Sequence, residues 1–242
     1  MIITRSPLRI SLGGGGTDLE SYYSKREGFL IAGAINKYIY SSIIKPFKKG
    51  IFLKYSKIEN IKQYKQIQHS IIRESLKKFL PTKFPQIEIV TLADIPSGTG
   101  LGSSSSFTNS LIKGLHAYNN VRINKSNLAK ESCYLEIDKL KQPIGKQDQY
   151  ISSYGGLKKF FFKKNGKVIV KDINISKQLT KKFEHKLCLI FTGYARSAND
   201  ILVKQKIDSN KNNKQMLKNL DHIKYLGKES LKSIEDNNFD NF

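Results

Sequence analysis

The chain has 242 residues, 39% of them hydrophobic, which is enough to form the core of one large domain or two modest domains. It carries 42 Lys and Arg against 20 Asp and Glu, a net charge of +22, but the lysines are spread along the chain and accompany no nucleic-acid-binding motif. We therefore expect anionic small molecules as partners, and neither nucleic acid nor membrane. There is no run of eighteen apolar residues and no signal-peptide pattern, which predicts a cytoplasmic protein.

The N-terminal part of the chain is predicted to contain mostly strands. Apolar alternation predicts a strand over residues 2–12, and the tetraglycine run at 13–16 interrupts it. Thr17 and Glu20 have the spacing of a capping box, which predicts a short helix with Thr17 as its cap. Further strands are predicted at 29–35, 38–44, 51–55 and 86–92, and a helix at 66–80.

The later part of the chain is predicted to contain helices around one hairpin. Asn165-Gly166 between two apolar runs predicts a β-hairpin. A lysine-rich stretch at 175–183 indicates a domain boundary before a further strand. The helices are predicted at 125–140, near 197–207 and at 214–236, and the strand at 186–192. Cys133 and Cys188 lie in apolar segments, so we expect both to be buried, reduced thiols.

Residues 96–106 read Pro-Ser-Gly-Thr-Gly-Leu-Gly-Ser-Ser-Ser-Ser and join a strand pattern to a helical pattern. Glycines in such a turn adopt conformations that a Cβ forbids, and the free N–H groups of the first helical turn attract anions. The last glycine is followed by Ser103 rather than by lysine, which excludes a Walker loop, and the alternating glycines do not fit a dinucleotide fingerprint. A flexible linker would not be framed by two periodic segments. The segment predicts a phosphate cradle for a nucleotide.

Three segments together resemble the GHMP kinases, the superfamily of galactokinase, homoserine kinase, mevalonate kinase and phosphomevalonate kinase. They are residues 6–18, which end in tetraglycine-Thr-Asp, the loop at 96–106, and Glu136 followed by residues 143–150. The first segment and the Gly-Lys-Gln-Asp-Gln-Tyr of the third are most similar to D-glycero-D-manno-heptose 7-phosphate kinases. The resemblance runs from residue 2 to about residue 207.

This resemblance implies an α+β fold of two domains, an ATP-binding domain over 1–178 and a C-terminal domain over 179–242. The second domain is shorter than in the superfamily, whose members are typically about a hundred residues longer and carry a third glycine-rich motif. A shortened domain would expose an apolar face of the 214–236 helix, which favours a homodimer.

The resemblance also implies the site residues. Asp148 takes the catalytic position, as proton acceptor or as the group that orients the attacking hydroxyl, and Arg9 stabilises charge on the transferred phosphoryl group. Ser104 and Glu136 match the Mg²⁺ ligands. The implied ATP-binding residues are Pro96, Gly98, Gly100, Leu101, Gly102, Ser103, Ser104 and Ser105. The implied substrate-binding residues are Gly15, Gly16, Thr17, Asp18, Lys146 and Arg196, the last two as partners of a phosphate.

A purely structural interpretation stays open for each charged residue: a surface ion pair for Arg9, a helix-terminal acid for Asp18, a solvated helix acid for Glu136 and a turn aspartate for Asp148. The implied function is transfer of a phosphoryl group from ATP, with Mg²⁺, to the anomeric C1 hydroxyl of D-glycero-D-manno-heptose 7-phosphate, giving the 1,7-bisphosphate. The alternatives are a kinase of another sugar, such as fucose or galactose, and a catalytically impaired nucleotide-binding fragment.

Overall fold

The computed structural model describes residues 1–82, 85–193, 203, 205, 207–209 and 213–238. The strands are β1 (Ile2–Gly13), β2 (Gly28–Ile44), β3 (Gly50–Lys54), β4 (Ile58–Ile61), β5 (Gln86–Ala93), β6 (Leu157–Phe162) and β7 (Val168–Asp172). The helices are α1 (Glu20–Arg26), the short 3-10 turn η1 (Tyr64–Gln66), α2 (Ser70–Phe79), α3 (Ser103–Tyr118), α4 (Lys125–Cys133), the π-helical η2 (Tyr134–Lys139), α5 (Gln147–Tyr154), α6 (Lys177–Lys186) and α8 (Lys214–Glu235). The predicted α+β fold class is confirmed.

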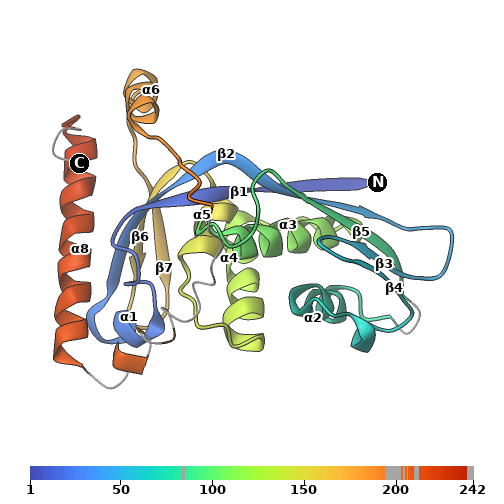
Figure 1. Cartoon of the computed structure of the whole chain (residues 1–242). Helices are drawn as coiled ribbons and strands as arrows, with labels where there is room; N and C mark the ends of the chain where they lie inside the picture. Colours follow the sequence, from blue (N-terminus) through green and yellow to red (C-terminus); the bar gives the residue numbers. More distant parts are fainter. Residues whose placement is uncertain (83–84, 194–202, 204, 206, 210–212, 239–242) are drawn as a thin grey trace.

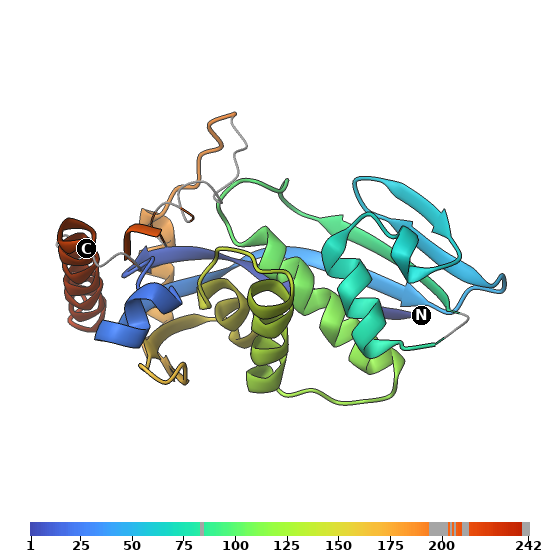
Figure 2. The same cartoon turned by 90° about the horizontal axis from the view of Figure 1, so that it is seen from below.

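One seven-stranded sheet organises the molecule around the long strand β2 (Figure 1). The strand order is β4-β3-β5-β2-β6-β7, and β1 also pairs with β2. The first part of β2 pairs antiparallel with β6 and the last part with β5, while β3 and β5 run parallel. Seen from below, α2, α3 and α4 lie across one face of this sheet (Figure 2).

Side-chain alternation along β2 builds a core on each face of the sheet. Leu30 and Ala32 point to the face covered by α4 and α5, where they pack with Ile151. Phe29 and Ile31, one residue out of phase, pack on the opposite face with Ile234 of α8. A larger core lies between α2, α3 and the strands β1, β2, β3 and β5. The first part of β2 is therefore covered by α4 and α5 on one face of the sheet and by α8 on the other.

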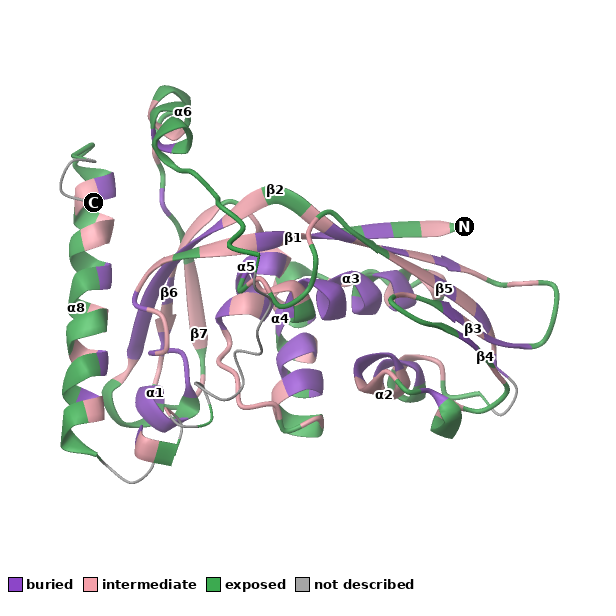
Figure 3. Cartoon of the chain, viewed as in Figure 1, coloured by how far each residue is buried: buried purple, intermediate pink, exposed green. Residues whose placement is uncertain are grey.

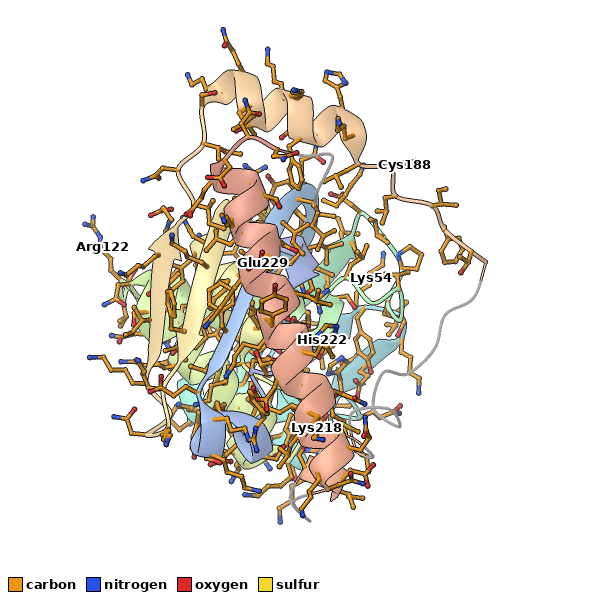
Figure 4. The ribbon with its side chains drawn as sticks, turned by 90° about the vertical axis from the view of Figure 1, so that its left-hand side faces the viewer. Lys54, Arg122, Cys188, Lys218, His222 and Glu229 are labelled. Carbon is orange, nitrogen blue, oxygen red and sulfur yellow. The ribbon has the colours of Figure 1, made fainter. Side chains whose placement is uncertain are left out.

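Helix α8 docks on the glycine run after β1 through a backbone-to-backbone contact. A Cβ added at Gly227 would lie 2.8 Å from the N atom of Gly14, and one added at Gly13 would lie 2.9 Å from the Cα atom of Gly227. The buried residues of α8 face the strands (Figure 3). Lys218 and His222 lie on the outward side of the helix (Figure 4). Glycine at these positions allows an approach that side chains would block.

Several sequence predictions are confirmed and others need correction. The predicted strands at 29–35 and 38–44 form the single strand β2, and β4 and α5 were not predicted. Helix α1 begins at Glu20, not after a Thr17 cap, because the Thr17 hydroxyl accepts the Phe29 N–H at 3.1 Å. The segment predicted as a strand at 186–192 belongs to no strand, and α6 occupies the lysine-rich stretch before it. The helix predicted near 197–207 lies mostly outside the described residues.

The two cysteines have different environments. Both are free thiols, as predicted, and Cys133 is buried, but Cys188 is exposed, which corrects the expectation that both are buried. Cys188 lies in the extended segment that follows α6 (Figure 4). Within the described residues, no helix has the length and apolarity to cross a membrane.

Candidate active site

The glycine loop leads from β5 into α3, as the sequence predicts. Gly98, Gly100 and Gly102 have φ angles of +78°, +75° and +73°, a region that L side chains rarely adopt. Gly102 is the N-cap of α3, and no side chain caps the helix there. The N–H groups of the first turn are therefore available to an anionic ligand. Of the other predicted loop residues, Pro96 and Ser104 are exposed, Ser103 is half-buried, and Leu101 and Ser105 are buried.

Arg9 and Asp148 form a bidentate ion pair against this loop. Arg9 Nε donates to Asp148 Oδ1 at 2.7 Å and Arg9 Nη2 donates to Oδ2 at 2.9 Å. A further guanidinium nitrogen of Arg9, Nη1, donates to the Gly100 carbonyl at 2.6 Å, and the Arg9 backbone N–H donates to the Leu101 carbonyl at 3.0 Å. A Cβ on Gly102 would lie 3.2 Å from Asp148 Oδ2. Residues far apart in sequence thus place one cation and one carboxylate beside the loop.

Glu136 is fully buried on η2, and both of its carboxylate oxygens accept hydrogen bonds. Ser104 Oγ donates to Oε1 at 2.7 Å, and Gln149 Nε2 donates to Oε2 at 2.8 Å. Burial raises the pKa of Glu136, and the two hydrogen bonds act in the opposite direction. Carboxylate and hydroxyl oxygens are hard donors that fit Mg²⁺, which needs few protein ligands. Within the described residues no group of three or more His, Cys, Asp or Glu forms a metal cluster.

Gln149 was not among the residues predicted from the sequence. It follows Asp148 on α5, and its backbone carbonyl accepts a hydrogen bond from Asn109 Nδ2 of α3 at 2.8 Å. Gln149 therefore connects the helix of the Arg9–Asp148 pair to the buried Glu136. The adjacency of Gln149 to Asp148 was visible in the sequence, but its contact with Glu136 depends on the packing of α5 against η2.

Asp18 lies between the glycine run and α5. Its side chain is buried, and Oδ2 accepts the Gln147 backbone N–H at 2.9 Å. A Cβ on Gly145 would lie 1.9 Å from that oxygen, so glycine is required for this approach. Burial raises the pKa of Asp18, and the Asp148 charge adds to the effect. Gly15 and Gly16 are half-buried beside it, and the Thr17 hydroxyl is engaged with the backbone of the glycine run and β2.

A cavity of about 760 Å³ opens on the other side of Asp18, between the β6–β7 hairpin tip and α1, α4 and η2. Lys146 lines it, and its Nζ donates to the Gly166 carbonyl at 3.0 Å and lies 4.8 Å from the centre of the Tyr23 ring. Arg196, the other residue predicted to bind phosphate, lies outside the described residues.

The fold and the site define a class of protein: an α+β domain in which a strand–glycine loop–helix unit faces an Arg–Asp pair and a buried Glu that is hydrogen-bonded to a Ser. Residues 67–156 match the family model of the GHMP kinases N terminal domain. The chain is 31% identical over 215 residues to a D-glycero-alpha-D-manno-heptose 7-phosphate kinase of Campylobacter jejuni, an alignment that covers 83% of this chain and 62% of that one. The chain thus spans about three fifths of the length of this relative.

Solved structures share the fold at lower identity. A D-glycero-D-manno-heptose 1-phosphate kinase from Bacteroides thetaiotaomicron superposes with a TM-score of 0.74 at 23% identity, covering 96% of this chain and 80% of that one. Lactococcus lactis galactokinase superposes with a TM-score of 0.63 at 16% identity, covering 98% and 71%. Residues 67–156 of the chain are thus a GHMP kinases N terminal domain.

Proposed function

We propose that this protein is an ATP- and Mg²⁺-dependent sugar-phosphate kinase that phosphorylates the anomeric C1 hydroxyl of D-glycero-D-manno-heptose 7-phosphate. The observation that carries the proposal is the Arg9–Asp148 pair, held against the glycine loop by hydrogen bonds to Gly100 and Leu101. The heptose 7-phosphate kinase named above supports the choice of substrate, since it is similar over 83% of this chain.

The glycine loop binds the ATP phosphates in this proposal. The uncapped N-terminus of α3 presents N–H groups and the positive end of the helix dipole, and the left-handed glycines keep side chains away from the ligand. Residues 96–105 form the nucleotide side of the site. The sugar enters from the opposite side, where Asp18 accepts hydrogen bonds from its hydroxyl groups.

Phosphoryl transfer depends mainly on positioning and on neutralising charge. The C1 oxygen attacks the γ-phosphorus, the bond from that phosphorus to the bridging oxygen of ADP breaks, and the hydroxyl proton passes to Asp148. An anomeric hydroxyl is more acidic than an ordinary alcohol, so orientation by Asp148 contributes as much as its basicity. Arg9, which pairs with Asp148 before substrate arrives, stabilises the negative charge of the transferred group.

Ser104 and Glu136 would hold the Mg²⁺ ion, which when bound neutralises charge on the nucleotide phosphates. The Ser104 hydroxyl and the Glu136 carboxylate lie 2.7 Å apart, and Gln149 fixes the second carboxylate oxygen. Lys146 would bind the phosphate that the sugar already carries.

Substitution of Asp148 tests the proposal. Asp148→Asn keeps the size of the side chain and removes the charge, so ADP release with heptose 7-phosphate is expected to fall by about 10²–10⁴-fold. The dissociation constant for ATP should change little, because the loop supplies the nucleotide contacts. Glu229→Gln, on the exposed face of α8, is the matched control and should keep the wild-type rate. A rate near wild type in Asp148→Asn would remove this residue from the mechanism.

A further inference from the structure

The cavity beside Asp18 is rich in lysine and lacks ion pairs. Lys130, Lys146, Lys164 and Lys167 line it, together with the carboxylates of Asp18, Glu20 and Asp138. Among the described residues, none of these four lysines forms an ion pair with a carboxylate. One of the three carboxylates, Asp18, is buried at the inner end, so the lysines dominate the opening. A cavity of about 760 Å³ is large enough for a sugar phosphate.

The β6–β7 hairpin tip holds these lysines in place. Gly166 has a φ of +81°, which fits the tight turn, and a Cβ on it would lie only 3.3 Å from Lys146 Nζ. Lys163, on the other side of the tip, pairs with Glu27 at 3.1 Å and anchors the hairpin next to α1. The tip is thus fastened at two points, while Lys164 and Lys167 remain exposed to the cavity mouth.

Lys146 keeps part of its binding capacity in this arrangement. An ammonium group has three N–H donors, and the Gly166 carbonyl takes one of them. The Tyr23 hydroxyl takes a second, and the Tyr23 ring lies against the charge with its centre 4.8 Å from Lys146 Nζ. One donor and the charge of the ammonium group are left for an anion that enters the cavity.

Asp18 connects the cavity to the Arg9–Asp148 pair, because it lines the cavity and accepts the backbone N–H of the residue that precedes Asp148. Lys146 and Asp148 flank Gln147, whose backbone N–H binds Asp18. Asp148 lies against Gly102 of the glycine loop, whereas Lys146, the N-cap residue of α5, lines the cavity together with Asp18. A sugar whose reacting hydroxyl lies at Asp148 would extend past Asp18 into the cavity.

We infer that this cavity binds the phosphate monoester at the end of the sugar remote from the reacting hydroxyl. Lys164 and Lys167 of the hairpin tip, together with Lys146, make the protein select a phosphorylated sugar over a free sugar. The inference rests on the proposed function for the position of the reacting hydroxyl, and it adds the hairpin tip as the element that determines specificity.

A binding experiment tests the inference without ATP or turnover. Calorimetric titration compares heptose 7-phosphate, heptose and inorganic phosphate with the wild type, with Lys164→Gln/Lys167→Gln and with Lys48→Gln/Lys49→Gln. The last pair is the matched control: two exposed lysines in the loop between β2 and β3, away from the cavity. Both pairs are exposed, so neither double variant should disturb folding.

We expect the hairpin variant to bind heptose 7-phosphate and inorganic phosphate at least tenfold more weakly than the wild type, with heptose affinity unchanged and the control unaffected. In NMR spectra of the wild type, inorganic phosphate should shift the amide signal of Gly166. Unchanged phosphate and sugar-phosphate affinity in the hairpin variant would overturn the inference, even if the protein turns over heptose 7-phosphate. Lysine-dependent binding with no ADP formed from any sugar would support the phosphate site and contradict the proposed kinase activity instead.

Discussion

Replacing Glu136 by glutamine should separate folding from metal binding. A glutamine side chain accepts the Gln149 N–H through its carbonyl and donates its amide to Ser104 Oγ, so both hydrogen bonds of the buried carboxylate can be kept. Because burial raises the pKa of Glu136, the charged form carries the desolvation cost that the amide avoids. Without metal, we expect the free energy of unfolding of Glu136→Gln to stay within about 1 kcal/mol of the wild type or to rise.

Glu136→Ala gives the contrasting result. It leaves the buried Gln149 amide without its acceptor, at about 1–3 kcal/mol, and it opens a cavity, whereas water can replace the acceptor of the exposed Ser104. Urea unfolding should therefore show a loss of about 2–5 kcal/mol. The difference between the two variants measures how much the hydrogen bonds of residue 136 stabilise the fold when no metal is present.

The decisive assay is denaturation with a non-hydrolysable ATP analogue, with Mg²⁺ or with a chelator. A ligand present at a hundred times its dissociation constant stabilises the folded state by about 2.7 kcal/mol. The wild type should gain stability when Mg²⁺ is added to the analogue, and Glu136→Gln should gain little beyond the analogue alone. Glu229→Gln, exposed on α8, serves as the control that behaves as the wild type. If Mg²⁺ raised the free energy of unfolding of Glu136→Gln as much as that of the wild type, Glu136 would not be a metal ligand.

Two further predictions concern the folding of the site. Gly227→Ala gains about 1 kcal/mol of helix propensity, but its Cβ would lie 2.8 Å from the Gly14 backbone, which costs about 1–3 kcal/mol. Urea unfolding should therefore show net destabilisation, whereas the control Lys228→Ala, at an exposed position of the same helix, should show none. A stabilised Gly227→Ala variant would disprove the close docking of α8. Burial raises the pKa of Asp18, so its contribution to stability is present below about pH 4 and is lost as pH rises through the folded-state pKa. Asp18→Asn should therefore gain stability relative to the wild type between pH 4 and pH 7 in urea unfolding, and a pH-independent difference would contradict the assignment.

The sequence predicted correctly those parts of the fold that depend on residues close together along the chain. The glycines at 98, 100 and 102 adopt the left-handed conformations that the loop requires, and Asn165-Gly166 forms the turn between β6 and β7. The apolar period of the last helix predicted the start of α8 and placed its end one residue too late. In each case the residues that carry the signal are neighbours in sequence.

The failures depended on contacts between distant segments. Thr17 has the sequence context of a helix cap, but its hydroxyl accepts the Phe29 N–H of β2, so Leu19 is the N-cap and α1 starts two residues later than predicted. The segment with Cys188 is a continuous apolar run of the kind that buried strands carry, yet it pairs with no strand in the part of the chain that the structure describes. Gln149 and the lysine-lined cavity depend on how α5 and the hairpin pack, which no local pattern encodes.

Release of ADP from Mg-ATP with a panel of sugars tests the central claim most directly. The panel contains heptose 7-phosphate, heptose, mannose, galactose and fucose, each incubated with the wild-type protein and with Asp148→Asn as the blank. The proposed function predicts turnover with heptose 7-phosphate, little with the free sugars, and loss of the activity in the variant. Turnover with galactose or fucose in place of the heptose phosphate would contradict the substrate assignment, and absence of ADP from every sugar while ATP still binds would contradict the kinase itself.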